Sequence, residues 1–294
     1  MTVVVRKRID IIYNPAAGFR NRKRFEFLLN ELEENGARPR VHETSSGTHA
    51  TDLARHIAAK GDTDILVAAG GDGTINDVVN GLGDAKVPLA VLPLGTANVL
   101  AIEIGLPRSA KKIAHVLMRG QTRDIALGQA NGRLFLLWVG AGLDAEITAL
   151  LSLSLKKRWG KASYVWAGLK YFLKGPGQPI DVCVNGENFR AGWVIVANAC
   201  CYAGRFKLAP QGHICNAELI ATICPAMNRW GALRYLTALG VGRLHRLRDV
   251  RVIPCAGVEF LAPKGAPIQI DGEGAGLLPQ QISLSPLNLS LVFP

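Results

Sequence analysis

The sequence has little of several features that would place it in a narrow class. Its 294 residues include 6 cysteines, with no Cys-x-x-Cys pair and no histidine at metal spacing. This argues against a zinc site and favours reduced, buried thiols. No run of 18 apolar residues occurs, because Asp144 and Glu146 break the longest candidate, residues 134–155, so we expect no membrane-spanning helix. The amino terminus carries charge where a signal peptide needs an apolar stretch, so we expect a cytoplasmic protein.

Acidic and aromatic residues are also few. Lysine and arginine exceed aspartate and glutamate by 11, so the surface attracts an anionic partner: nucleic acid, an anionic membrane or a phosphorylated substrate. Aromatic residues make up only 6% and no known nucleic-acid-binding motif is present, which speaks against nucleic acid. The cations gather at residues 6–8 with 20–24, at 156–161 and at 243–251. Each cluster taken alone could equally be a solvated face.

The first 124 residues alternate short apolar runs with helix-like segments. The pattern predicts strands over 9–13, 38–42, 64–69 and 88–92, and helices over 20–35, 47–60 and 74–82. This alternation is typical of a parallel sheet with helices on its faces. Ligands in such sheets bind at the loops that leave the carboxyl ends of the strands. We therefore expect a site in the loops after Tyr13, Ala69 and Leu92.

From residue 125 onward, short strands predominate. Helical patterns occur only within 143–173 and over 228–239, and the Asn185-Gly186 pair between alternating apolar residues predicts a β-hairpin. The sequence therefore predicts an α/β protein. Residues 1–124 would form an N-terminal parallel-sheet domain, and residues 125–294 a C-terminal, mostly antiparallel β domain.

The strongest local signal is the segment Gly70-Gly71-Asp72-Gly73-Thr74, where an apolar strand runs through three glycines directly into a helix. Glycines let backbone N–H groups approach phosphate oxygens, and a helix start adds unpaired N–H groups and a positive dipole end. We expect Thr74 to cap this helix. Asp72 would repel phosphate unless a magnesium ion lies between them. The alternative is a tight turn in which Asp72 is only a turn former.

Two further loops follow neighbouring predicted strands. The segment Pro93–Asn98 repeats the arrangement, and Thr96 could cap the next helix with its hydroxyl near a phosphate or ribose. The segment Asn14–Gly18 lies next to Arg20, Arg22, Lys23 and Arg24, which would favour a polyanion. An ordinary helix start and a plain turn explain these two loops about as well when each is considered alone.

Taken together, these segments resemble a known family. The patterns NPxxG at 14–18, GGDGT[IV]N[ED] at 70–77 and PxGTxN at 93–98, in this order, look like the catalytic domain shared by bacterial diacylglycerol kinases, sphingosine kinases and ceramide kinases. The resemblance continues in GxGxDA at 140–145, in the glycine-containing segment 202–210 that ends in proline, and in DGE at 271–273. It covers nearly the whole chain and looks like the bacterial, stand-alone branch.

The resemblance implies an ATP- and Mg²⁺-dependent lipid kinase of phospholipid biosynthesis, which phosphorylates a hydroxyl of diacylglycerol or a related lipid. The residues implied to bind the nucleotide are Asn14, Pro15, Ala16, Ala17, Gly18, Thr44, Gly71, Asp72, Gly73, Thr74, Ile75, Asn76, Asp77 and Thr96. Asp72 would hold the nucleotide's magnesium, and Asp144 would bind the substrate. Glu273 would accept the proton of the lipid hydroxyl, with Asp271 beside it. Phosphoryl transfer needs mainly positioning and charge stabilisation, plus one such carboxylate.

Two positions depart from the family pattern. Asp77 stands where the family has glutamate, and Asn216-Ala217 stands where related bacterial enzymes have the aspartate and glycine of a structural magnesium site. Asparagine offers a carbonyl oxygen but lacks the charge that favours magnesium. We therefore do not expect this second metal and assign no residue to it.

Two other interpretations stay open at this point. An NAD kinase-like enzyme would share GGDGT but is expected to lack PxGTxN and DGE, and a catalytically inactive lipid-binding regulator is disfavoured by the intact Asp72, Thr96, Asp271 and Glu273. The acceptor lipid and the choice of ATP over other triphosphates stay open too. So does the oligomeric state, with a homodimer as one alternative.

A lipid kinase without a membrane-spanning segment must meet its substrate at an interface. We expect peripheral contact with an anionic membrane through the apolar residues 150–155, the basic residues 156–158, Trp159 and the aromatic residues that follow. Those aromatic residues are Tyr164, Trp166, Tyr171 and Phe172. The alternative is that they belong to the core and that the lysines form a solvated face.

Overall fold

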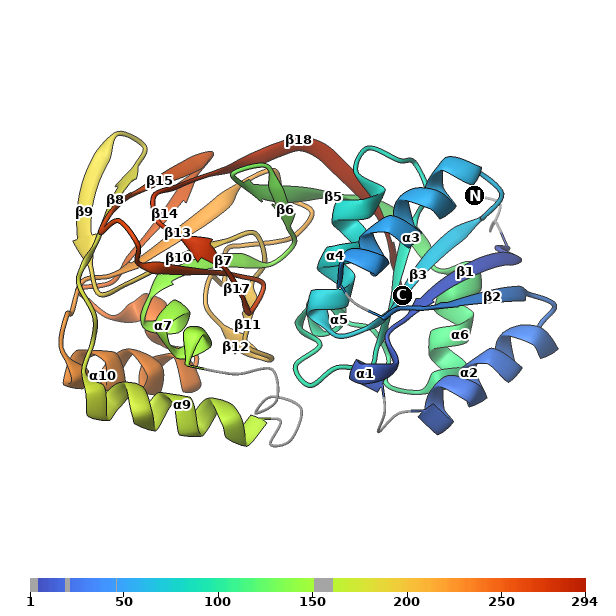
Figure 1. Ribbon diagram of the computed structural model, residues 1–294, viewed down its shortest axis with the longest axis horizontal. Coiled ribbons are helices and arrows are strands. Elements are labelled where there is room, and N and C mark those ends of the chain that lie inside the picture. The colour runs from blue at the N-terminus through green and yellow to red at the C-terminus, as the bar shows by residue number, and fades with distance from the viewer. Residues whose placement is uncertain (1–4, 19–21, 46, 151–160) are drawn as a thin grey trace. The chain divides into compact units, whose positions relative to one another are not determined.

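The computed structural model describes residues 5–18, 22–45, 47–150 and 161–294 (Figure 1). The chain forms two compact units, one of Met1–Ala126 with Pro286–Pro294 and one of Leu127–Ser285. The observed change of unit thus comes two residues after the expected end of the first domain at residue 124. The last nine residues differ from the expectation, because they return to the first unit: Leu291 pairs with Leu89 in parallel.

The first unit contains the expected parallel sheet, in the order β2-β1-β3-β4 with the end of β18 next to β4. Its strands are β1 (Arg8–Tyr13), β2 (Arg38–Glu43), β3 (Ile65–Gly70), β4 (Leu89–Pro93) and β18 (Gln280–Phe293). All six residues of β3 are buried, as expected for a central strand that is covered on both faces. The carboxyl ends of β1, β3 and β4 therefore lie at one edge of the sheet.

Helices cover both faces of this sheet (Figure 1). Helices α2 (Arg22–Glu34) and α6 (Ala110–Arg119) share one apolar core with alternate strand residues such as Ile11 and Val67. Helices α3 (Gly47–Lys60) and α4 (Asp72–Leu82) pack on each other and against β1 and β3. The short helices α1 (Pro15–Gly18) and α5 (Val99–Glu103) follow β1 and β4. Alternate residues of one strand pack against the helices on opposite faces of the sheet, because strand side chains point to opposite faces.

The second unit packs two antiparallel sheets face to face. One has the order β14-β13-β10-β7-β16-β17, and in the other β9, β8, β15 and the first part of β18 pair in turn. Side chains from both, such as Val194 and Phe260, fill one core. The strands are β5 (Gln121–Ala130), β6 (Arg133–Phe135), β7 (Trp138–Gly142), β8 (Ile180–Val184), β9 (Glu187–Ala191), β10 (Trp193–Ala197), β11 (Cys201–Tyr202), β12 (Phe206–Lys207), β13 (Leu219–Cys224), β14 (Arg251–Cys255), β15 (Gly257–Ala262), β16 (Pro267–Ile270) and β17 (Glu273–Leu277). The predicted hairpin is confirmed: Asn185 and Gly186, both at positive φ, join β8 to β9.

In the described part of the second unit, the helices are α7 (Leu143–Ala149), α9 (Lys161–Lys174) and α10 (Arg229–Gly240), and a 3-10 turn, η2, spans Leu244–Arg246. Asn228 caps α10, because its side chain accepts a hydrogen bond of 2.8 Å from the Gly231 amide. Residues 151–160, which carry most of the expected membrane segment, lie outside the described residues. Among the described residues, no helix combines the length and apolar character needed to cross a membrane.

Candidate active site

Three loops leave the neighbouring strands β1, β3 and β4 and are hydrogen-bonded to one another. The Asn14 amide donates to the carbonyl of Ala69 at 2.9 Å, and the Leu94 amide donates to the carbonyl of Gly70 at 2.9 Å. The Asn14 side chain donates from Nδ2 to Thr74 Oγ1 at 2.9 Å. The structure thus brings the three predicted loops together at one edge of the sheet.

The glycines of these loops are required by close packing. A Cβ on Gly95 would lie 2.5 Å from Gly71 Cα, and a Cβ on Gly70 would lie 2.6 Å from the Thr74 hydroxyl oxygen. Real Cβ atoms do not approach backbone this closely, so only glycine lets the second and third loops touch. Because Gly71 has no side chain, its backbone N–H group is not shielded by one.

Helix α4 begins without a side-chain cap. Gly71 is its N-cap, in extended backbone conformation, and the first helical residue is Asp72. The expectation that Thr74 caps the helix is therefore wrong: Thr74 lies inside the first turn, buried, with its hydroxyl bonded to Asn14. The N–H groups at an uncapped helix start suit the oxygens of a phosphate.

Asp72 contacts the next helix. Its two carboxylate oxygens accept hydrogen bonds from the amides of Val99, at 3.1 Å, and Leu100, at 3.2 Å. Burial raises the pKa of Asp72, although these amide bonds lower it. The sequence predicted that this carboxylate contacts magnesium. In the structure, it links the start of α4 to the start of α5.

Asn98, which the sequence analysis passed over, organises the third loop. It is the N-cap of α5 in left-handed backbone conformation, and its side chain both accepts from the Gly95 amide and donates to the Gly95 carbonyl, each at 2.9 Å. Asparagine tolerates this conformation better than most residues. Thr96 is exposed and does not cap the helix, so that expectation is also wrong.

The other expected nucleotide-binding residues lie around these loops. Asn14 Oδ1 accepts from the amides of Ala16 and Ala17, which holds the 14–18 segment in the single turn α1. Thr44 follows β2 and donates its amide to the Tyr13 carbonyl at 2.8 Å. The side chains of Ile75 and Asn76 are buried, and the carbonyl of Asp77 accepts from the Thr51 hydroxyl on α3. Ile75 therefore offers a ligand at most its backbone.

In the second unit, the carboxylate of Asp271 is held by backbone amides. The amides of Leu136, Leu137 and Trp138 donate to it at 3.0, 2.9 and 3.0 Å, and its own amide donates to the Trp138 carbonyl. Asp271 is buried and lies at a φ of 49°, in the left-handed region. This residue therefore fastens the 271–273 turn to the chain between β6 and β7.

Glu273 has the opposite environment. It is the first residue of β17, paired with Ile270, and its side chain is exposed. Within the described part of the chain, no hydrogen bond reaches its carboxylate. Of the two carboxylates on this turn, only that of Glu273 is available to a ligand.

Asp144, on α7, is linked to the same turn through a residue that the sequence analysis missed. Its Oδ2 accepts from the Tyr202 hydroxyl at 3.0 Å and from Gln269 Nε2 at 2.9 Å, while Gln269 Oε1 accepts from the Gly272 amide at 2.8 Å. Burial raises the pKa of Asp144 to about 7, although these hydrogen bonds lower it. The sequence signal that could have identified Gln269 is a polar residue in an otherwise apolar strand, two positions before Asp271.

The Asp144 carboxylate and the neighbouring backbone leave no room for side chains at the glycines of the GxGxDA segment. A Cβ on Gly140 would overlap the carboxylate of Asp144, and a Cβ on Gly142 would overlap the carbonyl of Gly192. Gly142 also has a φ of 84°. The segment thus lets β7 turn sharply into α7 and buries Asp144 against the strand.

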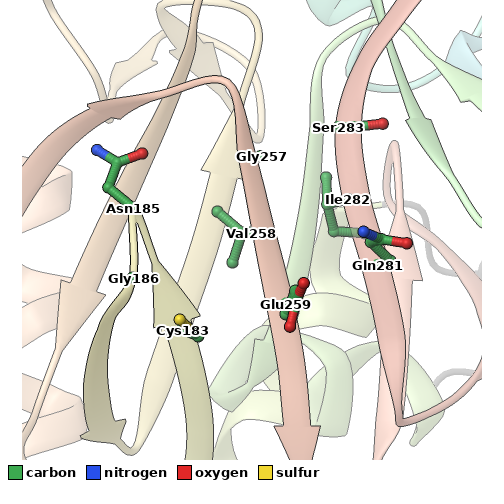
Figure 2. A pocket seen from close by; sticks show the side chains of 9 residues that line it. All are labelled: Cys183, Asn185, Gly186, Gly257, Val258, Glu259, Gln281, Ile282 and Ser283. Atoms are coloured by element: carbon green, nitrogen blue, oxygen red, sulfur yellow. The ribbon is translucent and has the colours of Figure 1, made fainter.

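The second unit also has a small hollow of about 160 Å³ over β8, β15 and β18 (Figure 2). Cys183, Asn185, Glu259 and Ser283 are among its lining residues, and none of the expected site residues is. Within the described residues, no group of three or more His, Cys, Asp or Glu side chains is placed to hold a metal ion.

Comparisons with known proteins cover both units. Residues 8–130 match the diacylglycerol kinase catalytic domain, and residues 138–293 match the YegS C-terminal NAD kinase beta sandwich-like domain. The chain is 29% identical to the diacylglycerol kinase of Bacillus subtilis strain 168, over 98% of this chain and 97% of the other. It is 31% identical to a protein of Pseudomonas putida named "Probable lipid kinase YegS-like", over 90% and 89%.

A solved structure, described as that of a diacylglycerol kinase from Bacillus anthracis, has the same fold. It superposes with a TM-score of 0.79 and 20% sequence identity, covering 98% of this chain and 97% of that one.

Proposed function

Because the chain belongs to the diacylglycerol kinase-like family of lipid kinases, we propose that it transfers the γ-phosphoryl group of ATP to a hydroxyl of diacylglycerol or a related lipid. The observation that carries the proposal is the start of α4, which has no side-chain cap. It lies where the glycine loops after β3 and β4 approach within contact distance. That arrangement suits a polyphosphate.

We assign the nucleotide to the loops of the first unit. Backbone N–H groups at 71–74 would receive phosphate oxygens, and the exposed hydroxyl of Thr96 would add a donor. Asn14 and Asn98 hold these loops in place, and the remaining residues of 14–18, Thr44 and 75–77 complete the walls of the site. We also propose residues 1–124 as the nucleotide-binding part and most of 125–285 as the lipid-binding part.

The residues present fit magnesium that arrives with the nucleotide. Asp72 lies at the start of α4, and its carboxylate could reach an ion directly or through water. When bound, magnesium would neutralise charge on the phosphate oxygens during transfer.

Glu273 is the proposed base. Its carboxylate would take the proton of the lipid hydroxyl while that oxygen forms a bond to the γ-phosphorus and the bond from this phosphorus to the bridging oxygen breaks, releasing ADP. Asp271 would position the turn, because three amides already use its carboxylate. Asp144 would bind the lipid headgroup and, through Gln269, support the same turn.

A transfer assay tests the function directly. The protein is incubated with γ-labelled ATP and magnesium against a panel of diacylglycerol, monoacylglycerol, a sphingoid base and NAD, and each labelled product is identified by mass. We expect label in one or more lipids. Label in NAD alone would favour an NAD kinase-like enzyme, and no product with any acceptor would favour an inactive lipid-binding regulator.

A further inference from the structure

Helices α9 and α10 of the second unit lie side by side (Figure 1). Both expose apolar side chains. On α9, Leu173 is 69% exposed, and on α10, Trp230 is 68% exposed. Trp166, Leu169, Leu233 and Val241 are also among the exposed large apolar residues. Such residues are normal singly, but here they are concentrated on two adjacent elements.

The spacing arranges these residues in stripes. On α9, Trp166, Leu169 and Leu173 fall on one helix face. On α10, Trp230 and Leu233 share a face, and Val241 follows the helix. The opposite faces hold buried residues, Tyr171 on α9 and Tyr235 on α10. Each helix thus buries some large side chains on one face and exposes apolar side chains on the opposite face. Tyr171 was expected at a membrane surface, and its burial corrects that expectation.

The two helices contact each other, and their exposed residues are here called the α9–α10 face. The ring of Phe172 meets that of Trp230 edge-on at 5.4 Å, and the Arg229 guanidinium lies 5.9 Å from the Phe172 ring centroid. A hollow of about 460 Å³ opens on α10, lined by Trp230, Leu233 and Val241 together with Arg234 and Arg243.

The charge of this region is mostly positive. Residues 161–174 contain three lysines and residues 229–248 contain five arginines, eight cations together, and neither segment contains Asp or Glu. Arg243, Arg246 and Arg248 are exposed in the segment after α10. Arg234 is paired with Asp249, outside these segments. Apolar stripes flanked by cations suit an interface between acyl chains and anionic headgroups.

We propose that the α9–α10 face docks the protein on an anionic lipid bilayer, with Trp230, Leu233 and Val241 at the headgroup boundary and the arginines on the headgroups. The proposal rests on the proposed function, because a lipid with long acyl chains is reached at an interface. A second copy of the chain fits less well as occupant, because it would bring a second set of cations against the first.

Vesicle co-sedimentation tests the docking face. The probes are phosphatidylcholine vesicles with and without phosphatidylglycerol, and the variants are Trp230→Ala/Leu233→Ser and Arg243→Glu/Arg246→Glu. Matched controls are Phe27→Ala, an exposed aromatic residue on α2, and Lys111→Glu/Lys112→Glu, the same charge change on exposed positions of α6.

We expect both variants to lower binding to anionic vesicles at least tenfold and both controls to bind like wild type. Wild-type binding should fall as salt rises. Unchanged binding in both variants overturns the proposal, and equal wild-type binding to neutral and anionic vesicles overturns its electrostatic part. A variant that changes the mass in solution while keeping vesicle binding would identify the face as a protein interface instead.

Activity on two substrates separates this proposal from the kinase function. With a short-chain diacylglycerol dispersed without vesicles, the variants should keep wild-type kcat, whereas with long-chain diacylglycerol in anionic vesicles they should lose at least tenfold. If wild type phosphorylates neither substrate, the proposed function fails while vesicle binding still reports on docking. If the variants lose activity equally on both substrates, the docking explanation fails.

Discussion

Asp271 and Glu273 lie two positions apart, and the structure separates their roles by what surrounds each carboxylate. Three backbone amides donate to the carboxylate of buried Asp271, while Glu273, the first residue of β17, is exposed. A carboxylate that already accepts three strong hydrogen bonds is a poor proton acceptor. This difference is why we propose Glu273, and not Asp271, as the base.

Glu273→Gln should lower kcat by about 100-fold or more and leave nucleotide affinity nearly unchanged, because the amide keeps the shape but cannot accept the proton. Steady-state kinetics with the lipid substrate and equilibrium binding of a nucleotide analogue measure the two quantities. Glu259→Gln, another exposed glutamate of the second unit, serves as the control. Near-wild-type turnover would remove the base from this turn.

Asp72→Asn should reduce the free energy of unfolding by about 1–3 kcal/mol, because an NH₂ group would then face the amide of Val99 or Leu100. Chemical denaturation measures this loss. If Asp72 also contacts the nucleotide's magnesium, the variant should lose more nucleotide affinity in magnesium than in EDTA. An equal loss in both conditions would leave Asp72 with only its link between α4 and α5.

Asp144 should make stability depend on pH. Its pKa is about 7 in the folded protein against an ordinary value of 3.8, so between these values the folded state holds a proton that the unfolded chain has released. The contribution of this group to the free energy of unfolding is therefore largest below about pH 4, falls as the pH rises, and is constant above about pH 7.

Asp144→Asn removes this titration. The stability of wild type relative to the variant should fall by an amount on the order of 3 kcal/mol as the pH rises from about 4 to about 8. Urea unfolding of both proteins across this range measures the difference, with exposed Asp52→Asn as the control. A difference that does not change with pH would show that Asp144 ionises normally in the folded state.

At the scale of elements, the loops after β3 and β4 act as a pair rather than as two separate turns. Gly95→Ala should destabilise the first unit by about 1–3 kcal/mol and weaken nucleotide binding, because the new Cβ would lie 2.5 Å from the backbone of Gly71. Thermal unfolding and nucleotide titration measure the two effects. Gly168→Ala in α9, where a Cβ would meet nothing within 4 Å, should be neutral or stabilising. Equal behaviour of the two variants would contradict the close approach.

At the scale of the whole molecule, the chain leaves the first unit at Ala126 and returns to it at Pro286. The returning segment buries Leu289, Leu291, Val292 and Phe293 in the first unit. Burying four such side chains contributes about 6–12 kcal/mol, which is comparable to the stability of an entire domain.

Deleting residues 286–294 should therefore unfold the first unit although the deletion lies at the other end of the chain. Hydrogen exchange should show lost protection in β3 and β4, while β10 and β13 of the second unit keep theirs. Deleting only exposed Pro294 should change nothing. Retained protection in β4 after the longer deletion would show that the first unit is complete without β18.

The sequence by itself determined the strands β1 to β4 with the helices α2, α3 and α4 between them, the Asn185-Gly186 hairpin and the three loops at the candidate nucleotide site. It did not predict α6 or the return of β18 to the first unit. The predicted features depend on side-chain periodicity and turn chemistry over a few neighbouring residues, which local sequence contains. The family motifs marked the residues of the candidate site in the same local way.

Only the tertiary structure decided which carboxylate of the 271–273 turn is bonded and which is exposed, because the partners of Asp271 lie more than 130 residues away. The same holds for the contact of Gln269 with Asp144, 125 residues apart, and for the pairing of Leu291 with Leu89. A buried polar group is stabilised by whichever donor the fold brings to it. Contacts between segments so distant in the chain leave no local pattern in the sequence.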